Sequence, residues 1–182
     1  MAVTTLPFRE RIQAERVAAT LVASVLVVKE KRIQNMEEAP PSPYTTLTLL
    51  EDATFRYGWS GEHAMQVAQS LFEGGLITYP RTDSTHTDPA ARETARSLAR
   101  ERYGADAVAK TIQMEEDQAA IEGAHEAIRP TEPATLPEQT ALPLDELTLY
   151  RLIWERFIAS QMKAARYWSI AVDLEVQENE RG

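Results

Sequence analysis

The strongest constraint on the fold is a regular alternation of apolar and polar residues near the carboxyl end of the chain. Apolar side chains occupy every second position there, in the order Trp168, Ile170, Val172, Leu174 and Val176. A period of two is typical of a half-buried β-strand. Such a strand needs a partner, and the comparable β-type run outside the middle of the chain is VLVV at 25–28, with a polar continuation to Met36. We therefore expect the two ends of the chain to pair in one small sheet around an inserted middle.

The middle of the chain carries the start and stop signals of helices. The proline-rich stretch 40–43 indicates a domain boundary, because proline fixes φ and lacks a backbone donor. The helices that we expect are a short one at 13–23, one capped by Thr45 or Thr46 and stopped by Gly58, one from Ser60 to Gly74, one from Thr87 or Asp88 to Gly104, and one from about Asp145 to Lys163.

The order helix, tight turn, helix and short strand, with Leu76 to Tyr79 as the strand, predicts a winged-helix-like unit. We interpret the apolar stripe that ends in Phe72, and the stripe of the last helix around Trp154, as core. The predicted fold class is α+β and mainly helical. Residues 1–44 and 162–182 form a small β domain, and residues 45–161 form a helical domain inserted into it.

Composition excludes several classes of protein. The chain has 182 residues and no cysteine, so a disulfide framework and thiolate metal sites are excluded. No apolar run approaches the length of a membrane span and no signal peptide is apparent, so we expect a cytoplasmic protein and no membrane partner.

The net charge of −9 does not favour tight binding of a nucleic acid by this chain alone. Much of the acid is local, however, as in the polar connector at 115–117 and the tail at 175–180. Arg92, Arg96 and Arg100 would form a basic stripe on one helix face. They are also consistent with a solvated face paired with neighbouring glutamates.

The segment GGLITYPRTDS at 74–84 delivers one tyrosine into a group of charged and hydroxylated residues. A phenol has a pKa of about 10, so a nucleophilic tyrosine needs a nearby cation or base. Arg81 lies two positions after Tyr79, and residues two apart face the same side of an extended backbone. The pair is thus a candidate for joint contact with one phosphate. The alternative is a buried strand that ends in an ordinary tyrosine.

A second segment, GAHEAIRPT at 123–131, adds His125 and Arg129. Together the two segments resemble the type IA DNA topoisomerases, most closely the bacterial topoisomerase I group. Two further segments fit the same resemblance, PSPYTTLTL at 41–49 and AMQVAQSLFEG at 64–74. The resemblance covers the family's tyrosine domain and flanking parts of its β arch domain, which here would be the two chain ends.

The resemblance implies that Tyr79 attacks a phosphodiester of single-stranded DNA and forms a 5′-phosphotyrosyl link, so that negative supercoils relax without ATP. Arg81 would be the second catalytic residue, stabilising charge on the phenolate and the scissile phosphate. His125 would hydrogen-bond a phosphate or be oriented by Asp83, and Arg129 would contact phosphate or tie its loop down by a salt bridge. The remaining candidates for phosphate or loop contacts are Thr82, Ser84 and Thr131.

The family also uses Mg2+, held by a Toprim domain with a D-x-D-x-E run, and this sequence contains no such run. We therefore expect no metal site and no cofactor in this chain, which would be an inactive fragment whose partners are single-stranded DNA and the remaining domains of a parent enzyme. Other readings are a fragment of topoisomerase III or reverse gyrase, or a non-catalytic winged-helix DNA-binding module. A nuclease or phosphatase lacks a metal or histidine-nucleophile constellation.

Overall fold

The computed structural model describes residues 10–108 and 125–177, so the connector at 115–117 lies outside the described residues. The chain divides into two compact units, one of residues 1–37 with 166–182 and one of residues 38–165. These boundaries lie a few residues from the expected positions after 44 and 161. Tyr44 is buried in the core of the second unit.

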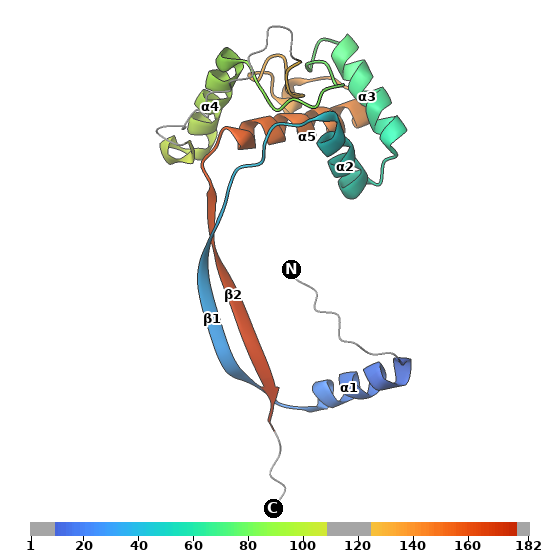
Figure 1. The fold of residues 1–182 in the computed structure, drawn as a ribbon, viewed down its shortest axis with the longest axis vertical. Helices are drawn as coiled ribbons and strands as arrows, with labels where there is room; N and C mark the ends of the chain where they lie inside the picture. Colours follow the sequence, from blue (N-terminus) through green and yellow to red (C-terminus); the bar gives the residue numbers. More distant parts are fainter. Residues whose placement is uncertain (1–9, 109–124, 178–182) are drawn as a thin grey trace, which may run out of the picture. The chain divides into compact units, whose positions relative to one another are not determined.

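The first unit is a two-stranded ribbon preceded by a helix (Figure 1). Helix α1 spans Arg11–Ala23, β1 spans Leu26–Glu38 and β2 spans Ala165–Val176. The strands are antiparallel: the Gln177 amide donates to the Val25 carbonyl at one end, and Arg166 contacts Glu37 at the other. The expected pairing of the two chain ends in one sheet is confirmed.

The expectation that the carboxyl-terminal strand is half-buried is wrong. Every residue of β1 and β2 is exposed, and Trp168 is 69% exposed. The alternation defines two faces of a strand, but burial also requires a layer that covers one face, and the described residues supply none for this ribbon. Cross-strand ion pairs join Lys29 to Glu175 and Arg32 to Asp173, the kind of pair that sets strand register.

The second unit contains four helices among its described residues. They are α2 (Thr46–Tyr57), α3 (Gly61–Glu73), α4 (Pro89–Tyr103) and α5 (Leu144–Ser160), with short 3-10 turns η1 (Ala105–Ala107) and η2 (Pro137–Gln139). The side chains of Thr45, Ser60 and Asp88 accept the capping hydrogen bonds of α2, α3 and α4. Gly58 ends α2 at φ 68°, in the left-handed region where glycine carries no steric penalty. The predicted helices are confirmed, although α5 ends at Ser160.

Helix α5 lies across the unit and packs against α3 and α4 (Figure 1). Its buried face includes Tyr150, Trp154 and Phe157, as expected. The stripe on α3 is buried at Ala64, Val67, Ala68 and Leu71. Phe72 departs from the core interpretation: it is 36% exposed and lies against Tyr79.

Residues 76–79 do not form the strand of a winged helix. Ile77 makes a single isolated bridge with Pro130, and a second bridge joins Tyr44 to Ile128. The amides that would extend this pairing into a ladder bond elsewhere: the Arg129 amide donates to the Thr78 hydroxyl at 3.0 Å, and the Leu76 amide donates to the Leu71 carbonyl at 2.9 Å. The α+β class with a two-stranded sheet is confirmed, whereas the winged-helix detail is not.

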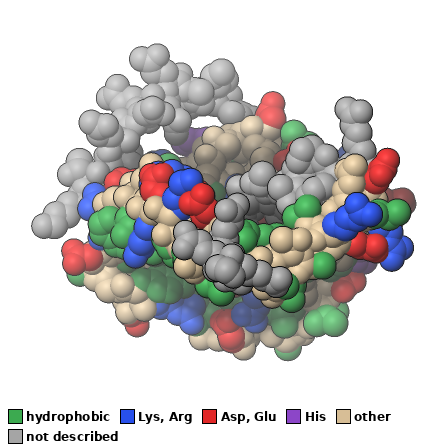
Figure 2. Space-filling view, turned by 90° about the horizontal axis from the view of Figure 1, so that it is seen from below, with side chains coloured by type: hydrophobic (Ala, Val, Ile, Leu, Met, Phe, Trp, Pro, Cys, Tyr) green, Lys and Arg blue, Asp and Glu red, His purple; other side chains and the backbone are tan. Residues whose placement is uncertain are grey.

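The surface carries charges of both signs. In the space-filling view, Lys and Arg side chains are interspersed with Asp and Glu side chains and with apolar ones (Figure 2). None of the helices formed by the described residues is both long and apolar enough to cross a membrane.

Candidate active site

Three segments that are far apart in the sequence meet in the second unit. They are 44–46, 76–86 and 125–131, and backbone hydrogen bonds of 2.8 to 3.0 Å join them. The donor and acceptor pairs are Ile128 to Tyr44, Thr46 to Thr82, Thr78 to Arg129, Thr131 to Leu76 and Ala127 to His86. The tyrosine segment (76–86), the histidine segment (125–131) and the TT segment (44–46, with Thr45 and Thr46) therefore form one hydrogen-bonded assembly.

Tyr79 reaches the surface of this assembly just after α3. The chain leaves the helix through Gly75, whose φ of 71° suits glycine, and Ile77 anchors the segment in the core. The Tyr79 side chain is 36% exposed. Its ring lies edge-on to Phe72 at 5.4 Å and against the imidazole of His125 at 5.1 Å, both measured between centroids. The tyrosine and histidine of the two motifs are thus neighbours.

Arg81 and Asp83 are exposed beyond the tyrosine. Among the residues that the structure describes, neither side chain makes a hydrogen bond or an ion pair, and no bond joins Asp83 to His125. Arg81 therefore offers its guanidinium to solvent or to an anion.

The backbone on either side of Arg81 is held by Thr46, the first residue of α2. The Thr46 hydroxyl donates to the Pro80 carbonyl at 2.7 Å and accepts from the Thr82 amide at 2.8 Å. The Thr46 amide in turn donates to the Thr82 carbonyl at 2.9 Å. This last bond satisfies a donor that the start of a helix leaves without an internal partner.

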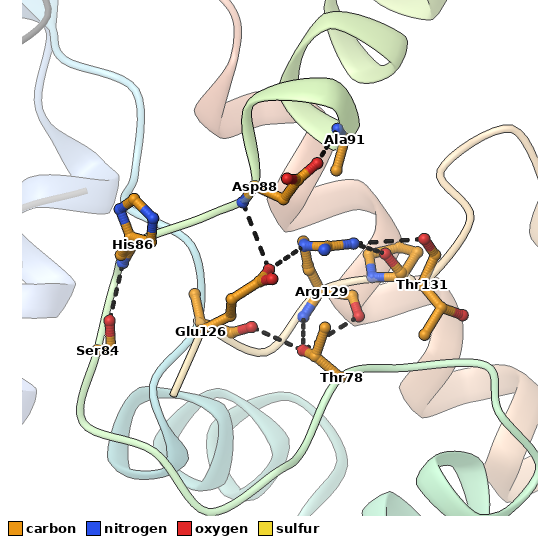
Figure 3. A network of polar contacts seen from close by, with 10 residues as sticks. Thr78, Ser84, His86, Asp88, Ala91, Glu126, Arg129 and Thr131 are labelled. Carbon is orange, nitrogen blue, oxygen red and sulfur yellow. Dashed lines mark hydrogen bonds and ion pairs between the residues drawn. The ribbon is translucent and has the colours of Figure 1, made fainter. Parts of the chain in front are cut away.

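Arg129 ties loops together instead of reaching into solvent (Figure 3). Its side chain is 9% exposed, and its Nε donates to Glu126 at 2.7 Å. Its Nη1 donates to the carbonyls of Pro130 at 2.8 Å and Thr131 at 3.3 Å. Glu126 also accepts from the Asp88 amide at 3.4 Å, at the start of α4. Of the two roles expected for Arg129, these contacts are those of the loop tie.

The hydroxyl candidates are also engaged within the loops. Thr82 is buried, and its hydroxyl accepts from the Ser84 amide at 3.0 Å. The Ser84 hydroxyl accepts from the His86 amide at 3.1 Å (Figure 3). The Thr131 hydroxyl donates to the Gly75 carbonyl at 2.6 Å, which fastens the turn before Tyr79. These contacts correspond to the loop alternative.

Two other tyrosines of the unit are held in the neutral form. Burial and a hydrogen bond to Asp52 raise the pKa of Tyr44 well above its usual value of about 10. Burial raises the pKa of Tyr150 to about 12, and its hydroxyl donates to the Thr135 carbonyl at 2.8 Å. Neither phenol is available as a nucleophile.

The basic stripe on α4 is partly neutralised by one acidic residue. Arg96 and Arg100 both lie within ion-pair distance of Glu93, at 3.8 and 3.1 Å. This geometry matches the solvated, paired face more than a free cationic stripe. The described residues contain no group of three or more His, Cys, Asp or Glu side chains placed to hold a metal ion.

The family model described as DNA topoisomerase matches residues 3–181, nearly the entire chain. The chain belongs to the DNA topoisomerase family. The resemblance to its type IA members is confirmed by relatives: the chain is 42% identical to DNA topoisomerase 1 of Thermotoga maritima over 78% of this chain and 24% of that protein. It is 37% identical to DNA topoisomerase 1 of Synechocystis, over 96% of this chain and 20% of that protein. It is 42% identical to the reverse gyrase of Pyrobaculum aerophilum, over 88% of this chain and 14% of that protein.

A solved structure of full-length topoisomerase I from Thermotoga maritima matches with a TM-score of 0.70 and 35% identity. The match covers 98% of this chain and 30% of that one. Of the three curated relatives named above, this chain covers 24%, 20% and 14% of the length, which is about a quarter or less of each.

Three contributors to this topoisomerase site escape sequence reasoning. Thr46 lies inside a segment that fits the family but carries no evident chemistry, and its partners are backbone atoms. Glu126 stands between two predicted site residues, and its spacing of three from Arg129 is a usable signal for a local ion pair. Phe72 follows the helical spacing of the buried residues of α3, so the sequence does not distinguish it from them; its exposure in the structure does.

Proposed function

We propose that this chain carries the nucleophile of a type IA DNA topoisomerase, an enzyme that cuts and rejoins one DNA strand through Tyr79 and so relaxes negative supercoils. The observation that carries the proposal is the contact of the exposed Tyr79 ring with His125, at 5.1 Å between centroids. Arg81, two residues after the tyrosine, is exposed and has no side-chain partner among the described residues. An accessible phenol with an unpaired cation two residues away supplies the two groups that attack on a phosphodiester requires.

The chemistry is a transesterification. The phenolic oxygen of Tyr79 forms a bond to phosphorus, the bond from phosphorus to the 3′ oxygen breaks, and the phenolic proton ends on that oxygen as a 3′-hydroxyl. The enzyme is then joined to the 5′-phosphate of the cut strand. Because one phosphodiester replaces another, the reverse attack by the 3′-hydroxyl restores the DNA without ATP.

Arg81 supplies positive charge to the phosphate as negative charge develops on the attacking and leaving oxygens. His125 lies against the Tyr79 ring, and in the proposal it donates a hydrogen bond to the scissile or a neighbouring phosphate. Thr82, Ser84, Thr131 and Arg129 act through the loops that they hold, and Asp83 keeps a supporting role near the exposed cation.

The residues that the structure describes contain no cluster of three or more ligands that would fit a magnesium site. The proposal therefore routes no step through a metal. It assigns Mg2+ to a Toprim domain elsewhere in the parent enzyme, and it includes the two-stranded ribbon as part of the parent's arch domain. Single-stranded DNA and the other domains of the parent are the proposed partners, in a cytoplasmic, nucleoid-associated enzyme that acts without a membrane.

The test uses the parent enzyme with Tyr79→Phe. Covalent protein–DNA adducts on a single-stranded oligonucleotide should vanish while DNA binding persists, because the substitution removes only the attacking oxygen. Tyr103→Phe is the matched control, since Tyr103 is 57% exposed on the same unit and outside the assembly. Adducts that persist with Tyr79→Phe would refute the proposal. No observation favours topoisomerase III or a non-catalytic winged-helix module over this function.

A further inference from the structure

The Thr46 hydroxyl contacts both peptide groups that flank Arg81. The Pro80 carbonyl belongs to the peptide before Arg81, and the Thr82 amide belongs to the peptide after it. The two bonds, of 2.7 and 2.8 Å, meet at one oxygen atom. A single side chain thereby fixes the orientation of the backbone from which the arginine projects.

We propose that Thr46 is a positioning residue for strand cleavage, which holds the backbone of Arg81 so that its guanidinium reaches the phosphate that Tyr79 attacks. The inference rests on the proposed function of Tyr79 and Arg81. It gives the TT segment, which matches the family without evident chemistry, a physical role in the site.

The start of α2, which carries Thr46, is fastened to the body of the unit. Thr45 caps α2: its hydroxyl accepts a hydrogen bond from the Thr48 amide, and the Thr48 hydroxyl accepts one from the Thr45 amide. Leu49 and Ala53 bury the next turns of α2 in the core. The hydroxyl is therefore fixed to the body of the unit, and the tyrosine loop is fixed to the hydroxyl.

The direction of the Arg81 side chain depends on how Thr46 holds the backbone, because no described residue makes a hydrogen bond or an ion pair with that side chain. A long side chain with no ion pair is aimed only by its own backbone and by the ligand. Small displacements of a catalytic group are costly, since a shift of about 1 Å can reduce a rate by about 100-fold. Loss of the Thr46 bonds should therefore lower the cleavage rate without removing any group that touches DNA.

The experiment measures the single-turnover rate of adduct formation and the Kd for the same oligonucleotide in the parent enzyme. Thr46→Val, which keeps the shape and removes the hydroxyl, should lower the rate by about 10- to 100-fold and leave Kd within about twofold. Thr46→Ser should restore the rate. Thr54→Val is the control, because the Thr54 hydroxyl also donates to a carbonyl, that of Trp59 at 3.0 Å, at the far end of α2; its rate should match that of the wild type.

A double-mutant cycle separates positioning from general damage. If Thr46 acts through Arg81, then Thr46→Val in an Arg81→Lys background should cost much less than it costs alone. A wild-type rate in Thr46→Val, additive losses in the cycle, or failure of Thr46→Ser to rescue would overturn the inference. Should Thr46→Val fail to fold, Thr46→Cys, whose thiol is a weaker hydrogen-bonding group, should give a smaller loss of rate, and a wild-type rate in that variant would overturn the inference equally. If Tyr79→Phe forms no adducts, the proposed function stands even when the Thr46 results overturn the positioning role. If Tyr79→Phe still forms adducts, both the proposed function and the positioning role are refuted.

Discussion

The imidazole of His125 lies against the phenol of Tyr79, with ring centroids 5.1 Å apart and planes inclined at 40°. The two residues come from different motifs, and the contact depends on backbone bonds between 76–78 and 129–131. It places a second hydrogen-bonding side chain beside the tyrosine that the proposed chemistry uses.

Replacement of His125 by alanine should lower the rate of adduct formation by about 100-fold, the lower part of the range for a positioned hydrogen-bond donor at a reacting centre. The adduct assay on a single-stranded oligonucleotide measures this. His63→Ala should leave the rate unchanged, since His63 pairs with Asp145 at the contact between α3 and α5. Equal rates for the wild type and His125→Ala would remove histidine from the mechanism.

Arg129→Ala should lower the free energy of unfolding by about 3 kcal/mol, because it removes the charged partner of Glu126 and the shared donor of two loop carbonyls. Urea unfolding measures the change. Arg151→Ala breaks a pair of similar length on the surface, with Glu138 at 2.8 Å, and should cost about 0.5 kcal/mol. Similar losses for the two variants would show that the loop tie has no special weight.

Gly75→Ala should destabilise the protein by about 1 kcal/mol, since Gly75 has a φ of 71° that other residues rarely adopt. A Cβ at this position would meet nothing within 4 Å, so the cost is one of backbone conformation alone. Gly75→Asn, which tolerates this conformation better, should cost less. Thermal unfolding of the two variants compares them, and a larger loss for asparagine would contradict the argument.

Stability should fall in alkaline solution as Tyr150 titrates. Its pKa is raised by burial to about 12 in the folded chain, against about 10 in the unfolded chain. The neutral phenol therefore contributes stability that is fully present below pH 10 and is lost as the pH rises toward 12. Unfolding free energies measured across that range should decline less steeply in Tyr150→Phe; an identical slope would argue against the burial effect.

Much of the fold is predictable from the sequence because its signals are local. Asp88 before Pro89 marks the start of α4, and Gly58 marks the end of α2, through contacts within one turn of each helix. Burial of the ribbon is not predictable in this way. The alternation around Ile170 shows that the strand has two faces, and it does not show whether anything covers either face.

Part of the site could also be predicted from the sequence. Tyr79, Arg81 and His125 stand out by chemistry and by resemblance to a family, and the structure brings Tyr79 and His125 together. The role of Thr46 was inaccessible, since its bonds run to backbone atoms of a distant loop and leave no trace in residue type. The strand expected at 76–79 does not form because the amides of Arg129 and Leu76, which would continue the pairing, donate to the Thr78 hydroxyl and the Leu71 carbonyl instead.

The most direct test of the account is to identify the residue that is joined to DNA. The parent enzyme is trapped on a single-stranded oligonucleotide and digested with trypsin, which cuts after Arg56 and Arg81 and leaves a peptide that contains Tyr57 and Tyr79. Fragment ions should place the nucleotide on Tyr79, through its 5′-phosphate. A nucleotide on any other residue, or a link through a 3′-phosphate, would contradict the account.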